Sequence, residues 1–173
     1  MDVRDFHKDF LEEIKATAAT EGAGSNAAFV NIATSYLVNA EVLSDFTPAF
    51  YLGTGKNNRK IRVDGYVLDE FDLTFNLVIA DYTGDEERET ITKTAALAHF
   101  DRLLYFIEEV YDGKLRREVE PSTPASDLVE TLVLHKERIR KFRLILITDG
   151  FMSNRISEMD PDTFKNTPVE KQI

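Results

Sequence analysis

The sequence predicts an α/β fold in which a small mixed β-sheet is flanked by helices. Two segments with helical spacing of apolar residues open the chain, a strand hairpin follows within residues 60–82, and two more helices precede a strand at 141–148. This order is typical of a sheet sandwiched between helices. The 173 residues and their 43% hydrophobic content suit one domain with a core of its own.

The first two expected helices are amphipathic. Residues 3–18 place apolar side chains every three or four residues, namely Val3, Phe6, Phe10, Leu11 and Ile14. Gly22 and Gly24 end this helix, and Ser25 is placed to cap the second one. The stripe expected to be buried in the second helix is Phe29, Ile32, Ala33, Tyr36, Leu37 and Ala40. Residues 45–59 are predicted to be a loop, with 49–53 as a candidate short strand.

The segment "KIRVDGYVLDEFDLTFNLVIADY", residues 60–82, predicts two strands and a turn. In the first strand, apolar and polar side chains alternate. The second strand is apolar on both faces near its end, which is typical of a central strand covered on both sides. The turn is expected at 69–72.

A polar connection leads to a helix at residues 90–111, and its acidic residues 85–89 are expected at the helix N-terminus. The buried stripe of this helix is expected to be Leu97, Phe100, Leu103, Leu104, Ile107, Val110 and Tyr111. Residues 112–120 are predicted to be a charged loop. Thr123 and Pro124 begin the next helix as N-cap and first residue. Residues 1–160 form the predicted domain, and 161–173 are expected to be a linker or the start of a truncated next element.

The composition excludes several classes of function. A formal net charge of −10 predicts a soluble chain that is repelled by nucleic acid at long range, although a local basic groove remains compatible with it. The absence of cysteine rules out disulfides, thiolate metal sites and cysteine nucleophiles, and it fits a cytoplasmic protein. The charged N-terminus is not a signal peptide, and no membrane contact is expected, because no apolar run could span a bilayer.

A turn at residues 69–72 fixes a register for the hairpin. It puts Leu68 opposite Leu73, Asp64 opposite Leu77, and Lys60 opposite Asp81. Directly opposed residues point to the same side of a sheet. The predicted common face therefore contains Lys60, Arg62, Asp64, Ile79 and Asp81.

This face predicts a candidate site. Asp64 and Asp81 are the candidate metal ligands for Mg²⁺ or Mn²⁺ if the site is active, and with Lys60 they are the candidate catalytic residues. The alternative interpretation is an ordinary Lys60–Asp81 surface pair beside a solvated Asp64. The basic run Lys56, Arg59, Lys60 and Arg62 is the candidate nucleic-acid contact. The histidines, His7, His99 and His135, are expected to be surface or capping residues without ligand spacing.

The hairpin and the "TGDEERETITKT" that follows it resemble the abortive infection phage resistance family, whose members have "IDGYxxDExxxxLxLxxxxF", an acidic stretch and "LTKT" in this order. Two later blocks are also similar. "EVEPSTPASDLVETL" resembles the family's "ESSPAxDLA", and "RLILITDGFMSNR" resembles its "RxxLxTNGxLSxR". The resemblance runs from about Lys60 to about Arg155.

The resemblance implies a restriction-endonuclease-like αβββαβ core, which uses an aspartate on one strand and Glu-x-Lys on the next. Asp64 falls on the aspartate, whereas Ile79 and Asp81 fall on the glutamate and the lysine. Isoleucine cannot coordinate a metal, and aspartate cannot supply the positive charge of lysine. The resemblance therefore implies the N-terminal nuclease-like domain of a bacterial phage-defence protein that is catalytically degenerate and acts in binding or regulation.

Two alternatives stand beside this interpretation. One is a metal-dependent nuclease with a rearranged site, in which Asp81 replaces the lost carboxylate and Lys60 the lost lysine. The other is a non-enzymatic module for protein interaction or sensing. The expected partners are nucleic acid, bound weakly, a phage or host protein, and the rest of a longer chain, since family members are longer and "NTPVEKQI" reads as the start of a further strand.

Overall fold

The computed structural model describes residues 2–153, 156 and 159–173, so Asn154 and Arg155 of the last resembling block lie outside the described residues. The helices are α1 (Val3–Glu21), α2 (Ser25–Asn39), α3 (Lys93–Tyr111), α4 (Lys114–Glu118) and α5 (Pro124–His135). The strands are β1 (Thr47–Thr54), β2 (Lys60–Asp69), β3 (Thr74–Asp81), β4 (Lys141–Thr148), β5 (Asp162–Phe164) and β6 (Thr167–Gln172), with a short 3₁₀ turn at Lys56–Asn58.

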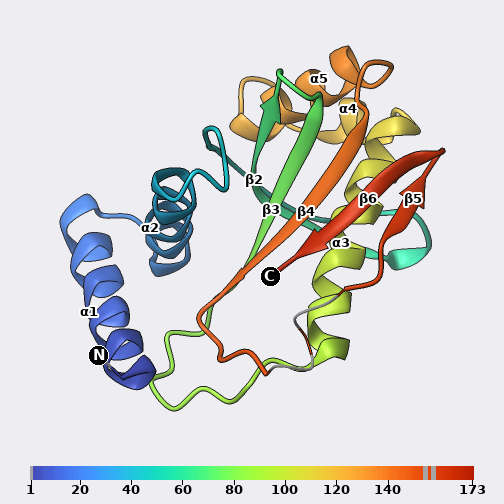
Figure 1. Ribbon diagram of the computed structural model, residues 1–173. Helices are drawn as coiled ribbons and strands as arrows, with labels where there is room; N and C mark the ends of the chain where they lie inside the picture. The colour runs from blue at the N-terminus through green and yellow to red at the C-terminus, as the bar shows by residue number, and fades with distance from the viewer. Residues whose placement is uncertain (1, 154–155, 157–158) are drawn as a thin grey trace.

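The six strands form one mixed sheet in the order β1-β2-β3-β4-β6-β5 (Figure 1). The pairs β1–β2, β2–β3 and β5–β6 are antiparallel, whereas β3–β4 and β4–β6 are parallel. Helices lie on both faces, so the predicted α/β class with a mixed sheet is confirmed. No helix in the described part of the chain combines the length and apolarity needed to cross a membrane.

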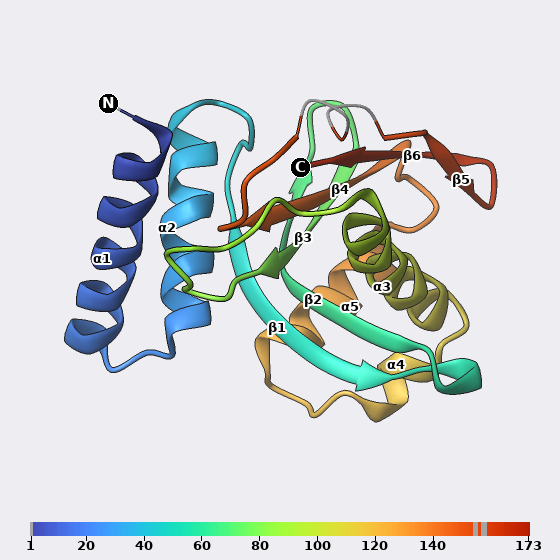
Figure 2. The same cartoon turned by 90° about the horizontal axis from the view of Figure 1, so that it is seen from below.

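Two hydrophobic cores lie on opposite faces of the sheet. On the face of α3, α4 and α5, the core includes Phe75, Leu77, Ile79, Phe100 and Phe142. On the face of α1 and α2, it includes Leu11, Phe29, Val78, Ala80 and Ile145. Figure 2 shows the α1–α2 pair on one side of the strands and α3 on the other. Because β3 alternates between the two cores, its side chains are buried on both faces, as expected for a central strand.

Local capping signals explain where α3 and α5 begin. Thr123 accepts a hydrogen bond from the Ser126 N–H at 3.2 Å and Pro124 is the first residue of α5, as predicted. The third helix begins later than predicted, at Lys93, because Thr92 caps it by accepting from the Ala95 N–H at 3.1 Å. The predicted loop at 112–120 is wrong in part, since α4 forms within it and buries Leu115.

Three further segments differ from the expectations. The candidate strand at 49–53 is a strand and extends over Thr47–Thr54. In α2, Tyr36 is exposed instead of buried, because its ring meets Phe10 and its hydroxyl donates to Glu13 of α1 at 3.0 Å. The segment 161–173 forms β5 and β6 of the same sheet rather than a linker, because Val169 is buried beside Phe142.

The predicted hairpin register is wrong by two residues. The observed pairs are Asp69 with Thr74 and Leu68 with Phe75, so the turn covers residues 70–73. Leu73 belongs to the turn, since its φ of 59° is left-handed rather than extended. Asp69 and Asp72 hold the turn by accepting hydrogen bonds from the Phe71 and Thr74 N–H groups, both at 3.0 Å.

Candidate functional site

Asp64 lies where β2 changes its orientation. Val63 packs in the α3 core and Val67 in the α2 core, although strict alternation would put both on one face. The kink lies at Asp64 and Gly65. A Cβ at Gly65 would come within 2.7 Å of the Thr47 carbonyl oxygen and would overlap the Phe46 ring. Glycine is therefore required here by the close approach of β1.

The carboxylate of Asp64 is surrounded by donors. Arg62 donates from Nε to Oδ2 and from Nη2 to Oδ1, both at 3.0 Å. The Ala80 N–H donates to Oδ2 at 2.8 Å, and Asn26 Nδ2 lies 3.3 Å from Oδ1. The residue is only 3% exposed. Asp64 thus serves as a strand partner for β3, with its charge neutralised by a bidentate arginine.

Asp81 belongs to a different environment. Its Oδ1 lies 3.5 Å from His99 Nε2 of α3, and its Oδ2 is paired with Arg88 and accepts from Thr148 Oγ1 at 3.4 Å. The predicted common face is wrong, since Asp64 points toward α2 and Asp81 toward α3. Lys60 pairs across the strands with Thr54 of β1 instead of Asp81. The kink in β2 is the physical reason.

A divalent metal ion does not fit the two carboxylates as they stand. Both oxygens of Asp64 hold hydrogen-bond donors, and Asp81 is held by Arg88 and His99. A hard cation would have to displace an arginine from each side chain. In the part of the chain that the structure describes, no group of three or more metal-ligating side chains is found. The catalytic and metal roles of Asp64, Asp81 and Lys60 stay predictions.

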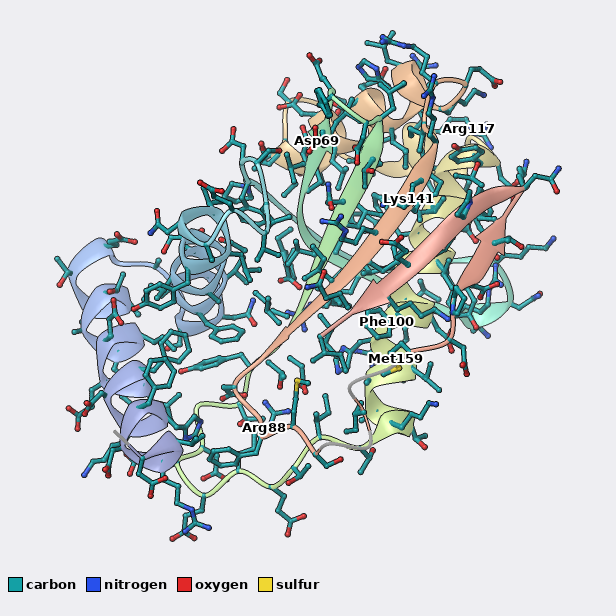
Figure 3. All side chains as sticks on the ribbon, viewed as in Figure 1. Asp69, Arg88, Phe100, Arg117, Lys141 and Met159 are labelled. Atoms are coloured by element: carbon teal, nitrogen blue, oxygen red, sulfur yellow. The ribbon has the colours of Figure 1, made fainter. Side chains whose placement is uncertain are left out.

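A charged cluster occupies the carboxyl ends of β3 and β4, at the end of the sheet away from Asp69 and Lys141 (Figure 3). Arg88 pairs with both Asp81 and the fully buried side chain of Asp149, and it donates to the Asp81 carbonyl oxygen at 2.7 Å. Asp149 also accepts from the Gly84 N–H at 2.7 Å and the Thr83 N–H at 3.0 Å. The cluster therefore fixes the loop that leaves β3.

The hydrogen bond from His99 is the main cause that lowers the pKa of Asp81 to about 2, and the charge of Arg88 lowers this pKa further. Both act against burial, which raises the pKa.

Residues 85–89 were expected at a helix N-terminus, whereas they lie in the loop before α3. The signal that sequence reasoning missed is a pair of aspartates at the ends of two strands, with an arginine between them in sequence. The carboxyl ends of neighbouring parallel strands meet at one edge of the sheet.

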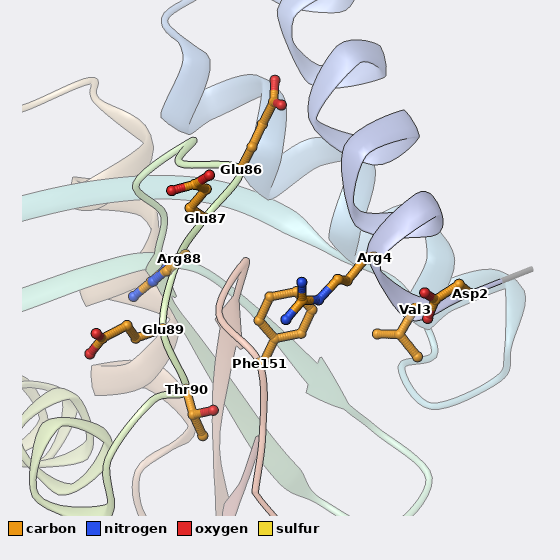
Figure 4. Close-up of a pocket in the computed structure, with 9 residues that line it drawn as sticks. All are labelled: Asp2, Val3, Arg4, Glu86, Glu87, Arg88, Glu89, Thr90 and Phe151. Atoms are coloured by element: carbon orange, nitrogen blue, oxygen red, sulfur yellow. The ribbon is translucent and has the colours of Figure 1, made fainter.

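A cavity of about 840 Å³ lies beside this cluster, between the start of α1 and the loop before α3 (Figure 4). Its lining residues are Asp2, Val3, Arg4, Glu86, Glu87, Arg88, Glu89, Thr90 and Phe151. In Figure 4, Arg4 extends from α1 toward the Phe151 ring, whereas the Arg88 side chain points away from both. Arg88 is instead paired with Asp81 and Asp149. The lining therefore mixes four carboxylates with two arginines, of which Arg88 is already neutralised by its aspartates.

The candidate basic run is only partly available to a ligand. Arg59 pairs with Glu108 at 2.5 Å and lies over the Tyr105 ring, 4.0 Å from its centroid. Arg62 is held by Asp64, while Lys56 and Lys60 are exposed. Two of the four predicted cations thus belong to internal ion pairs.

The comparisons with known proteins place the chain in a family. The model of the abortive infection phage resistance protein N-terminal domain matches residues 29–173, which excludes α1 and the start of α2. Neither the curated proteins nor the solved structures contain a match. The match covers most of the sequence, including every strand and the whole charged cluster. The chain therefore belongs to the family of abortive infection phage resistance protein N-terminal domains.

Proposed function

We propose that this phage-defence domain has a nuclease-like core that performs no phosphodiester chemistry and acts instead in binding or regulation. The observation that carries the proposal is the state of Asp64. It stands where the resemblance puts a catalytic aspartate, yet Arg62 and the Ala80 N–H fill its oxygens. A carboxylate in this state stabilises the fold and does not bind a metal.

The neighbouring strand supports the same conclusion. The side chains of β3 on the α2 face, next to Asp64, are those of Val78 and Ala80, which have no metal-ligating atoms. On the other face, Ile79 is fully buried in the apolar core and Asp81 is paired with Arg88. The positions aligned with Glu-x-Lys therefore contribute packing and an internal ion pair.

The regulatory part of the proposal rests on the family. A domain of an abortive infection protein that lacks catalysis serves defence by contacting a phage product, a host protein or another part of its own chain. The chain's net charge of −10 favours protein over nucleic acid as that partner. The open cavity beside α1, of about 840 Å³, is a concave surface that is available for such a contact.

The test combines metal binding with cleavage. The wild type is incubated with DNA and RNA in Mg²⁺ or Mn²⁺, and Mn²⁺ is titrated calorimetrically into the protein alone. We expect no cleavage and no saturable heat. Asp64→Asn and Asp81→Asn are the site variants, and Asp101→Asn, at an exposed position of α3, is the matched control. Metal-dependent cleavage that is lost in Asp64→Asn and kept in Asp101→Asn would favour the rearranged nuclease and overturn the proposal.

A further inference from the structure

The strand β1 forms one edge of the sheet and carries exposed apolar side chains. It stands first in the strand order, and no strand in the described part of the chain pairs with its outer edge. Phe50 is 57% exposed and Leu52 is 63% exposed. Ala49 and Tyr51 pack into the α3 core, so Phe50 and Leu52 point to the opposite face. An uncovered apolar edge of this kind is a template for pairing with another strand.

Charges of opposite sign flank this edge. Asp45 is exposed just before β1, and its carboxylate only accepts from the adjacent Phe46 N–H. Lys56 follows β1, and Lys60 pairs with Thr54 at the same end. Both lysines are exposed, and among the described residues neither they nor Asp45 forms an ion pair. One end of the strand is therefore acidic and the other basic.

We propose that a second copy of this chain pairs with β1 in antiparallel orientation, about a twofold axis near Tyr51. In this register, Phe50 of one copy lies opposite Leu52 of the second copy, and the reverse pair is formed at the same time. The acidic end of each strand meets the basic end of the other. Asp45 of each copy therefore lies beside Lys56 of the other copy, and the twofold axis forms this contact two times. The two sheets join into one continuous sheet.

The pattern favours a copy of the same chain over other partners. When β1 of one copy pairs in antiparallel orientation with β1 of the other, the two apolar centres face each other. Each acidic end then faces a basic end. Nucleic acid would be repelled by Asp45 and by the net charge of −10 of the chain. Pro48 has no N–H to donate, so the backbone pairing is limited to the residues that follow it and the charged ends meet beyond the paired segment. The proposal is independent of the function proposed for the Asp64 region.

The first experiment measures the assembly state of the 173-residue chain by sedimentation velocity over a concentration series. We expect a reversible dimer in the wild type and a monomer for Leu52→Lys. The matched control is Leu134→Lys, which makes the same change at a side chain of α5 that is 77% exposed and should leave the dimer intact. A monomeric wild type at every concentration, or a Leu52→Lys protein that dimerises like the control, overturns the proposal.

The second experiment tests the orientation by charge reversal. Asp45→Lys and Lys56→Asp should each raise the dimer dissociation constant about tenfold, because two like-charge contacts replace two attractive ones. The double variant restores opposite charges at both ends and should recover the wild-type constant. If the double variant dimerises no better than the single ones, strand pairing in this register is wrong. Circular dichroism spectra confirm that each variant is folded.

Discussion

The buried carboxylates of this domain are each held by a cation from a nearby segment. Asp64 is paired with Arg62, Asp149 with Arg88, and Glu109 with Lys114 at 3.6 Å. Removing a charge from water is costly unless partners replace the lost hydration. Each pair also accepts backbone N–H groups, so it fixes the course of a strand or loop. These side chains serve fold geometry, which is why a strand, a helix and a strand end can each contain a buried carboxylate here.

The Arg88 pair gives a first prediction at the residue scale. Arg88→Met leaves Asp81 and Asp149 together without their cation, and we expect a loss of about 3–5 kcal/mol in the free energy of unfolding. Lys93→Met is the matched control, since Lys93 faces only the exposed Asp160 at 3.9 Å and should cost less than about 1 kcal/mol. Urea denaturation measures both. Equal losses would mean that the cluster is not a stabilising network.

A second prediction concerns acid pH. The pKa of Asp81 is about 2 in the fold and near the ordinary value of 3.8 when unfolded, so its contribution to stability is complete above about pH 4 and is lost as the pH falls toward 2. The contribution is on the order of 2 kcal/mol. The unfolding free energies of wild type and Asp81→Asn should therefore converge as the pH falls from 5 toward 2. A difference that stays constant over this range would contradict the assigned cause.

At the scale of elements, the sheet extends to the end of the sequence. The strand β6 pairs in parallel with β4, and β5 closes the edge in antiparallel orientation. Tyr111, Phe142 and Phe164 pack edge-to-face in this region, with ring centroids 4.9–6.4 Å apart. The last residues are therefore structural parts of the domain.

Val169 provides the corresponding prediction. Its side chain is fully buried in β6, and Val169→Ala should lower the free energy of unfolding by about 2 kcal/mol, through lost burial and the cavity left behind. Val3→Ala is the control, because Val3 is exposed at the start of α1 and should change stability by less than about 0.5 kcal/mol. Thermal unfolding followed by circular dichroism compares the two. An unchanged midpoint for Val169→Ala would mean that β6 is not docked in solution.

The elements that sequence predicts well are those with local signals. The run at residues 141–148 forms β4 with the predicted ends, and Thr123 with Pro124 begins α5 as predicted. The hairpin register depends on Leu73 adopting a left-handed conformation, which a leucine rarely adopts. The kink at Gly65 depends on contact with β1. Neither can be derived from the hairpin alone. The kink is the reason that the predicted common face is wrong, because a register shift of two residues leaves each side chain on its original face.

At the scale of the whole molecule, the candidate site could be predicted only in its parts. Sequence reasoning found Asp64 and Asp81 as unusual strand residues. It assigned Arg88 to the acidic cluster of its sequence neighbours. The ion pair of Arg88 with Asp149 could not be foreseen, because the two residues lie far apart in the chain. It also treated His99 as a surface residue, although Asp81 lies 3.5 Å from its Nε2. Such pairings exist only once β3, β4 and α3 are packed together.

The charge distribution gives a prediction for nucleic-acid binding. With a net charge of −10, and Arg59 and Arg62 engaged in internal pairs, only weak binding is expected. Any binding that is measured at low salt should involve Lys56 and Lys60, and replacing both with Ala should reduce the salt slope by about two. Lys8→Ala with Lys15→Ala on α1 is the matched control. Affinity and slope that are the same for both double variants would remove the basic run as a contact.

The contact between Asp64 and the Ala80 N–H restricts how this domain can change by mutation. Loss of Arg62 alone would leave the buried Asp64 carboxylate without its cation. A new carboxylate on β3 alone would place a second negative charge beside Asp64 on the neighbouring strand. Each single step toward a metal site is destabilising, so the steps would have to occur together. An intermediate of low stability would therefore separate this sequence from one with a metal site at Asp64. Mutational drift that preserves folding then keeps the arginine in place and prevents such a site from forming in single steps.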